Sequence, residues 1–298
     1  MNYVPPPGEP PIPFSPQVRW EPPPPYDPRH SYLPPPLLKP NWPLHIGLFV
    51  ATAIATWLTA GPLYAASIMS ILLAHEMGHY LTARYYRVPA TPPYFIPMPG
   101  ISLFGTMGAV IRMATMGANR KLLFDIAVAG PIAGMVLAVP ACVIGLKLSR
   151  VVDVGAMSGP HVNLGTSILF QWFSDVIVGP LGPGKDIELH PIAFAGWAGL
   201  FVTSLNLIPV GQLDGGHVAY ALLGRRAHLL AIVVALAFIA LAIFVSWSWV
   251  VLAAMVAFFG LRHPPTGDDS TPIGTPRLVV GVALLLLFAL TFTPRPFE

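Results

Sequence analysis

Long apolar stretches alternate with short polar connections along most of the chain after residue 43. A transmembrane helix needs about 20 apolar residues, so this pattern predicts an all-α polytopic membrane protein with about six or seven spans. The stretch 228–261 is too long for one span, and residues 246–249 are the expected turn within it. The expected spans lie near residues 44–61, 64–84, 121–146, 191–211, 228–245, 248–261 and 277–293.

Composition agrees with this pattern. Mean hydropathy is +0.66 and charged residues make up 10% of the chain, against roughly 25% in soluble domains. The formal net charge is only +3, and basic residues do not cluster with aromatic ones, so we expect no nucleic-acid partner. Cys142 is the only cysteine, which excludes an intrachain disulfide and a thiolate zinc site. A lipid bilayer is therefore the expected environment.

The chain divides into three parts. Residues 1–43 hold 17 of the 36 prolines, which favours an extended, disordered tail or a docking segment for an aromatic-lined groove. Residues 44–265 contain most of the expected spans, with a core of three near 64–84, 121–146 and 191–211. Residues 266–298 are expected to form a linker and an extra C-terminal span.

Basic residues in the connections predict orientation, because cytoplasmic loops are enriched in Lys and Arg. The connections 85–121 and 212–227 are basic, whereas 147–190 carries mixed charges. The first two are therefore expected to face the cytoplasm, together with the N-terminus, and the third is expected to face outward. This places residues 75–79 in the cytoplasmic half of the second span, in a multi-pass protein of the cell (inner) membrane. Within the third connection, residues 161–180 are expected to contain an amphipathic helix on the outer surface.

The connection after the second span contains an apolar stretch, 92–112, that is interrupted by proline and glycine. Such a stretch does not form a stable helix, and we expect a membrane-associated β-hairpin or re-entrant element. An exposed strand edge there can pair with an extended peptide. A plain amphipathic connector is the alternative.

The main candidate chemistry is the sequence His75-Glu76-Met77-Gly78-His79 within the second apolar span. A helix places residues i and i+4 on one face, so both histidines can bind one metal ion. Glu76 then lies beside the ion without being a ligand, where it can accept a proton from water. Ionisable groups inside a membrane span are costly and indicate a functional site.

The third ligand has to come from elsewhere in the chain. Asp214 is the only acid in the region where the fourth long span ends, and Pro209 and nearby glycines interrupt the helix there. Two histidines and one carboxylate, with water in the fourth position, are a common catalytic zinc arrangement. Helix capping by Asp214 is an alternative, and His217, one turn further on, is a rival ligand. Asp125, an acid inside the third span, is expected to be structural or to face the same cavity.

Two spaced motifs give the chain a family resemblance. His75-Glu76-Met77-Gly78-His79 is an HExxH motif, and Asn206, Pro209, Leu213, Asp214 and Gly215 match NxxPxxxLDG. In this order they resemble the site-2 proteases, the intramembrane zinc metalloproteases of peptidase family M50. The resemblance covers roughly residues 64–265, and no segment is long and polar enough for the PDZ or CBS domains of some relatives.

The resemblance implies that His75, His79 and Asp214 hold one Zn²⁺ per chain, with Glu76 as the catalytic base. Asn206 is expected to donate a hydrogen bond to the developing oxyanion or to the substrate backbone. The implied partner is a transmembrane protein substrate, cut in or near its membrane segment. The sequence leaves open the substrate's identity and the oligomeric state. It also leaves two alternative functions open, a metal-binding membrane transporter and a catalytically silent scaffold of the same fold.

Overall fold

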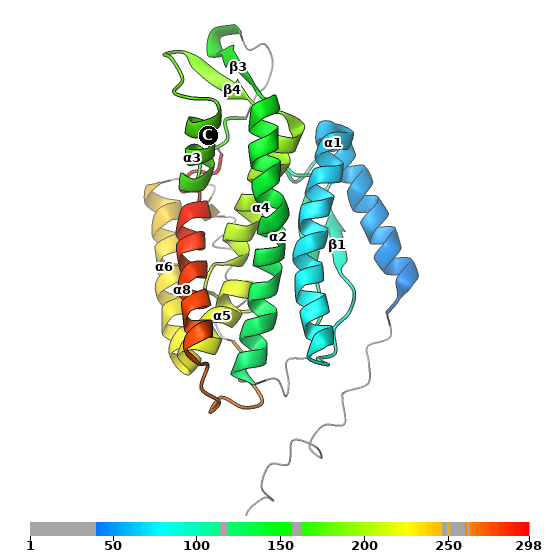
Figure 1. Cartoon of the computed structure of the whole chain (residues 1–298), viewed down its shortest axis with the longest axis vertical. Helices are drawn as coiled ribbons and strands as arrows, with labels where there is room; N and C mark the ends of the chain where they lie inside the picture. The colour runs from blue at the N-terminus through cyan, green and yellow to red at the C-terminus, as the bar shows by residue number, and fades with distance from the viewer. Residues whose placement is uncertain are drawn as a thin grey trace, which may run out of the picture. The chain divides into compact units, whose positions relative to one another are not determined.

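The computed structural model describes residues 40–113, 119–156, 162–245, 249–250, 260 and 263–297. Almost all of the proline-rich tail, and most of the predicted span 248–261, lie outside these residues. Helices predominate, and the strands form only two two-stranded sheets. Figure 1 shows the helices running along one common direction, with the small sheets beside or beyond them. The mainly helical class predicted from the sequence is therefore confirmed.

Helix α1 (Trp42–Tyr85) contains the first two predicted spans. It is interrupted at Ala60 and Gly61, whose backbone angles are not helical, and Pro62 follows. Gly61 has φ of 83°, which glycine adopts without steric cost, and Pro62 has no N–H for the helix ladder. The break separates two helical segments close to the predicted boundary. The helix begins at Trp42, two residues before the predicted start of the span at residue 44, because Asn41 accepts a hydrogen bond from Leu44 N and caps it.

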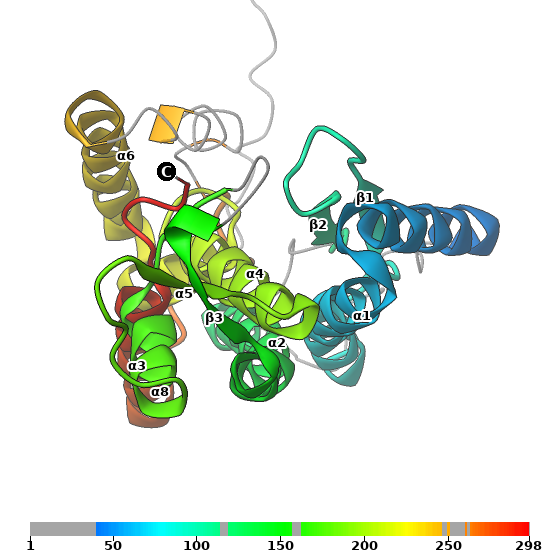
Figure 2. The same cartoon turned by 90° about the horizontal axis from the view of Figure 1, so that it is seen from above.

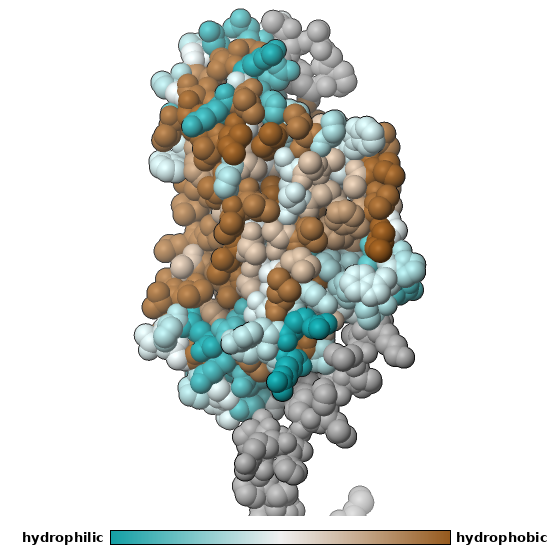
Figure 3. Space-filling view, turned by 45° about the vertical axis from the view of Figure 1, so that its right-hand side comes forward, coloured by the Kyte–Doolittle hydropathy of each residue, from teal (hydrophilic) through white to brown (hydrophobic). Residues whose placement is uncertain are grey.

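Three helical segments of the described chain are long and apolar enough to cross a membrane: Trp42–Tyr85, Arg120–Leu148 and Asp214–Phe244. The second is α2, and the third joins α5 (Asp214–Leu223), the 3-10 turn η2 (Gly224–Arg226) and α6 (Ala227–Phe244). Helix α8 (Thr275–Thr291) is apolar but shorter. The total of six or seven spans is thus not confirmed. In Figure 3, apolar residues cover the middle of the visible face and polar residues lie at both ends.

Helix α4 (Pro191–Asn206) corrects one predicted boundary. The expected span continued to residue 211, but the helix ends at Asn206. Pro209 three residues later cannot continue a helix, and the residues before it turn instead. The helix is short and mostly buried, because α2 and α1 pack along it. Figure 2 shows α4 in the interior of the helical arrangement, with α1 and α2 beside it.

The predicted hairpin lies between α1 and α2. Strands β1 (Tyr94–Pro97) and β2 (Thr106–Val110) are antiparallel, with Tyr94 opposite Val110 and an irregularity between Phe95 and Pro97. The hairpin packs on the first half of α1, where Phe95 meets the Phe49 ring edge-on at 5.1 Å between centroids. The connection therefore contains a β-hairpin and is not a plain amphipathic connector.

The mixed-charge connection after α2 forms a second small unit. Strands β3 (Arg150–Asp153) and β4 (Lys185–Glu188) pair antiparallel, with opposite charges facing each other at both ends. Between them lie the 3-10 turn η1 (Val154–Ala156) and helix α3 (Ile168–Ile177). The Ser167 side chain caps α3, which is shorter than the predicted segment 161–180.

Polar contacts join α2 to α8 and to α5. Arg277 contacts the Asp125 carboxylate through two nitrogens, at 2.8 and 2.6 Å, and Tyr86 donates to the same carboxylate at 2.8 Å. Arg120, at the start of α2, donates to the carbonyls of Ala221 and Leu222 at the end of α5. Asp125 therefore has a structural role. Its carboxylate binds Arg277 and Tyr86 and does not face the active-site cavity.

Candidate metal centre

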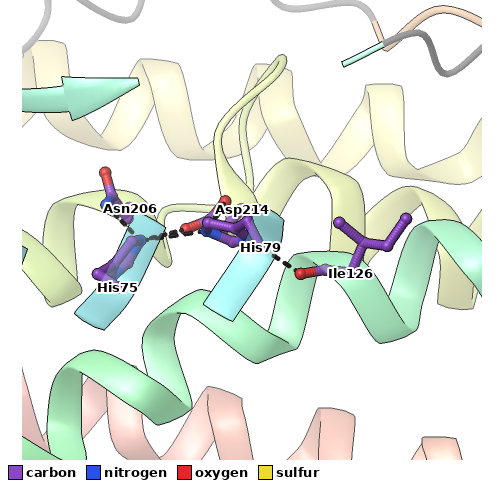
Figure 4. A network of polar contacts seen from close by, with 5 residues as sticks. All are labelled: His75, His79, Ile126, Asn206 and Asp214. Atoms are coloured by element: carbon purple, nitrogen blue, oxygen red, sulfur yellow. Dashed lines mark hydrogen bonds and ion pairs between the residues drawn. The ribbon is translucent and has the colours of Figure 1, made fainter. Parts of the chain in front are cut away.

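The second half of α1 presents two histidines one helical turn apart. His75 and His79 are 4% and 6% exposed, and their Nε2 atoms lie 3.2 Å apart. The i, i+4 spacing places both rings on the same side of the helix. The structure thus brings together the pair that the motif predicts (Figure 4).

The Asp214 carboxylate completes the cluster from the other end of the fold. Oδ2 lies 3.1 Å from His75 Nε2, and Oδ1 lies 3.2 Å from His79 Nε2. Asp214 is the first residue of α5, and the N-cap position belongs to Leu213, which makes no side-chain cap bond. The carboxylate is directed at the two imidazoles, so the helix-capping alternative is not observed.

A tight turn between α4 and α5 positions Asp214. Gly211 has φ of 55°, a conformation that glycine adopts at little cost. A Cβ on Gly215 would collide with the Leu207 carbonyl, and one on Gly216 with the carbonyls of Gly211 and Val210. These glycines allow the first turn of α5 to lie directly on the preceding backbone. The glycine that follows Asp214 in the second motif is therefore required sterically, because a side chain there would collide with the backbone of the turn.

The three side chains fit a tetrahedral zinc ion. Ligand atoms at 2.0–2.1 Å from such an ion lie about 3.3 Å from one another. The two Nε2 atoms lie 3.2 Å apart, and each lies 3.1–3.2 Å from a different oxygen of the Asp214 carboxylate, so the neighbouring donor atoms are separated by about the distance that a tetrahedral ion requires. Within the described residues, this is the only group of three His, Cys, Asp or Glu side chains close enough to share an ion. Two imidazoles and a carboxylate are a donor set that zinc accepts well.

Two further contacts orient the imidazoles, and the sequence argument did not foresee them. His79 Nδ1 lies 2.8 Å from the Ile126 carbonyl of α2, so Nδ1 carries the proton and Nε2 keeps its lone pair for a cation. Asn206 Nδ2, at the end of α4, lies 3.1 Å from His75 Nε2. Each imidazole therefore has a partner from a different helix.

Helix α2 approaches α1 closely at this point because it carries two glycines. A Cβ on Gly130 would overlap the His79 ring, and one on Gly134 would lie 3.2 Å from His75 Nδ1. The sequence Gly130-Pro131-Ile132-Ala133-Gly134 is a small-xxx-small pattern, which is typical of closely packed membrane helices. From the sequence alone, this pattern could have predicted that α2 packs closely against the helix that carries the histidines.

Glu76 and His217 have different surroundings. Glu76 is 6% exposed, and its electrostatic neighbours are His79 and Asp214. His217 is not part of the cluster, since its Nδ1 lies 2.6 Å from His263 Nε2 in the segment before α8. The structure thus separates the rival ligand from the three residues that converge.

Comparison with known proteins agrees with this geometry. The sequence model of Peptidase family M50 matches residues 63–247. The chain is 33% identical over 244 residues to probable zinc metalloprotease EGY2, chloroplastic, of Oryza sativa subsp. indica, covering 80% of this chain and 43% of that protein. It is 34% identical over 243 residues to probable zinc metalloprotease EGY1, chloroplastic, of Arabidopsis thaliana, covering 77% and 42%. No solved structure matches the chain.

The chain belongs to peptidase family M50. The family match includes both sequence motifs, the second half of α1 with the two histidines, and α5 with Asp214. The chain spans about two fifths of the length of the curated relatives it matches. The names of these relatives describe zinc metalloproteases of the chloroplast.

Proposed function

We propose that this protein is an intramembrane zinc metalloprotease that hydrolyses a peptide bond in or near the transmembrane segment of membrane-protein substrates. The observation that carries the proposal is the convergence of His75, His79 and Asp214 within apolar helices. Membership of peptidase family M50 supports the reaction class. The apolar surroundings support a substrate that is itself membrane-embedded.

One zinc ion per chain is held by His75 Nε2, His79 Nε2 and one oxygen of Asp214 in this proposal. When bound, the ion supplies a Lewis acid and makes a water molecule acidic near neutral pH. The Ile126 carbonyl keeps His79 in the tautomer that binds a cation through Nε2. Gly130 lets α2 bring that carbonyl close enough.

Glu76 moves the protons. Its position next to His79 on α1 places the carboxylate beside the cluster rather than in it. There it takes a proton from the attacking water and passes it to the leaving amine nitrogen. The low exposure of Glu76 keeps bulk water from competing for that proton.

Asn206 is the proposed contact for the substrate oxygen. Its amide nitrogen lies 3.1 Å from the very nitrogen of His75 that binds the cation. Once that lone pair is engaged by the cation, the Asn206 N–H has lost its acceptor and is available to an oxygen atom at the same place. A donor in that position stabilises negative charge on the carbonyl oxygen as water attacks.

The topology proposed from the basic loops places the site in the cytoplasmic half of a cell (inner) membrane, with the N-terminus in the cytoplasm. The division at residues 43 and 265 belongs to the same proposal. The hairpin β1–β2 supports a membrane-associated element, because it packs on the first half of α1 rather than on a polar domain.

The test compares purified wild-type protein with Asp214→Ala, His75→Ala and Glu76→Gln. We expect about one zinc per chain in the wild type and in Glu76→Gln, and none in the two ligand variants, by elemental analysis. Only the wild type should cut a model transmembrane peptide in detergent or in liposomes. Wild-type cleavage rates in Glu76→Gln, or zinc retained without Asp214, would contradict the assignment.

The same samples separate the two other functions. A transporter predicts metal flux into liposomes without peptide cleavage, whereas a silent scaffold predicts neither. The complete set of Glu76 and three ligands favours the enzyme, because a silent relative is expected to have lost one of them.

A further inference from the structure

An aromatic cluster on the middle of α4 (Pro191–Asn206) is contacted by the chain's own C-terminal segment. Phe104, in the loop between β1 and β2, lies near Trp197 and Phe201 of α4, with ring centroids 6.0 and 5.9 Å away. The Phe297 ring packs against all three, at 6.3, 6.2 and 5.9 Å from Phe104, Trp197 and Phe201. We call the surface that Phe104, Trp197 and Phe201 present to Phe297 the aromatic slot.

The segment that brings Phe297 to the slot is extended. Phe297 forms an antiparallel bridge with Leu164, and Gly165 N donates to the Pro296 carbonyl at 3.1 Å. Pro294 and Pro296 prevent a helix here. Trp197 Nε1 donates to the Gly165 carbonyl at 2.8 Å, so the wall of the slot also holds the strand that pairs with the tail. The slot therefore accepts an aromatic side chain from an extended peptide.

The other end of this segment is attached to the α6 side of the fold. Phe292 stacks on Trp249 at 5.2 Å, and Trp249 Nε1 donates to the Pro294 carbonyl at 2.7 Å. Phe238 of α6 packs against the same tryptophan. Among the described elements, the hairpin packs on α1 and α6 packs on α5. Residues 292–297 thus join two sides of the fold, and Figure 2 shows the C-terminal stretch between α6 and the hairpin.

The slot is a few helical turns or less from the metal centre along the α4 axis. Phe201 and Trp197 precede Asn206 by five and nine residues on α4, which is about 7 to 14 Å along a helix axis. An extended peptide covers this distance in about two to four residues. Helix α2 covers one side of the centre with Gly130 and Gly134, so a substrate has to approach from another side.

We propose that the aromatic slot binds a large apolar side chain of the transmembrane substrate, about two to four residues from the scissile bond, and that Phe297 is an internal occupant that the substrate displaces. This inference rests on the proposed function, since it assigns a specificity subsite to that enzyme. The extended form of the tail matches what the site requires, because a helical substrate hides its peptide carbonyls in internal hydrogen bonds.

The test uses Glu76→Gln protein in detergent and a lysine-flanked Leu/Ala transmembrane peptide with a central Gly-Pro pair. A photoreactive phenylalanine analogue is placed at successive positions from the Gly-Pro pair. We expect crosslinks to residues 104, 197 or 201 from positions two to four residues away. Phe297→Ala should raise the yield about tenfold and Phe297→Leu by less, because leucine keeps part of the packing. Phe244→Ala, at a position 82% exposed, is the matched control and should leave the yield unchanged.

A competing peptide provides a readout that does not depend on the folding of a tail variant. The hexapeptide Phe-Thr-Pro-Arg-Pro-Phe, the sequence of residues 292–297, should suppress crosslinking in Phe297→Leu protein. The same hexapeptide with its last residue changed to alanine should not. Crosslinks outside the slot, or equal yields in wild type, Phe297→Leu and Phe244→Ala, would overturn the assignment.

Cleavage assays on proteins with an intact Glu76 distinguish the two proposals. Zinc-loaded wild type that crosslinks through the slot but never cuts the peptide would count against the protease and not against the slot. Cleavage with equal KM for peptides with phenylalanine or alanine at the same position, in both wild type and Phe297→Leu, would count against the slot alone.

Discussion

The contact between Gly130 and His79 allows a sharp test of how α2 supports the metal centre. A methyl group at position 130 would overlap Nε2, Cδ2 and Cε1 of the His79 ring. The ring is held by its hydrogen bond to the Ile126 carbonyl of the same helix. To relieve the overlap, either α1 must move away from α2 or the ring must turn away from that carbonyl.

The size of the effect follows from both routes. Forcing an extra methyl into a packed core costs about 1–3 kcal/mol. Loss of the outer partner of a metal-binding histidine lowers metal affinity about 10- to 100-fold, which is about 1.4–2.8 kcal/mol. We therefore expect Gly130→Ala to weaken zinc binding about 10- to 100-fold. Alanine is otherwise the better helix former by about 1 kcal/mol. A lower zinc affinity in Gly130→Ala therefore cannot be explained by helix propensity.

Two other glycines make matched controls. A Cβ at Gly134 would lie 3.2–3.3 Å from His75 atoms, a contact that small shifts relieve, and one at Gly47 would meet nothing within 4 Å. Zinc affinity, measured by competition with a chelator on purified protein, should fall most in Gly130→Ala, slightly in Gly134→Ala and not at all in Gly47→Ala. Wild-type affinity in Gly130→Ala, with a normal melting temperature, would refute the close approach of α2 as a requirement of the site.

Three further predictions test separate contacts. Asn206→Ala should keep its zinc and lower kcat about 100-fold, as expected for loss of an oxyanion donor; loss of zinc instead would make Asn206 a support for His75. Asp125→Asn should lower thermal stability by about 1–2 kcal/mol through the weakened bidentate pair with Arg277, with unchanged zinc content by elemental analysis. Burial lowers the pKa of His263, so the folded chain favours the neutral ring, the unfolded chain binds more protons, and stability falls as pH drops below about 6.5. Amide protection factors around His263, corrected for the intrinsic pH dependence of exchange, should therefore be lower at pH 5.5 than at pH 7.5, and equal protection factors at both values would contradict the burial of a neutral His263 ring.

The sequence by itself determined the local parts of this protein. The i, i+4 spacing of His75 and His79 is a property of any helix, and the apolar runs predicted where most helices lie. The helix break near Gly61 and the turn after Asn206 also follow from local rules, because glycine and proline have their own backbone limits. Asp214 was reachable as third ligand because it is the only acid in its region and matches a known motif.

Tertiary structure decided the contacts between distant parts of the chain. His75 and Asp214 are 139 residues apart, and His79 and Ile126 are 47 apart; no periodicity encodes which carbonyl a histidine will meet. The same holds for the partners of Asp125 and His217, and for the insertion of Phe297 beside Phe104. Local rules restrict the backbone of a few neighbouring residues, whereas these contacts depend on how closely whole helices approach, which in α2 is decided by the missing side chain of Gly130.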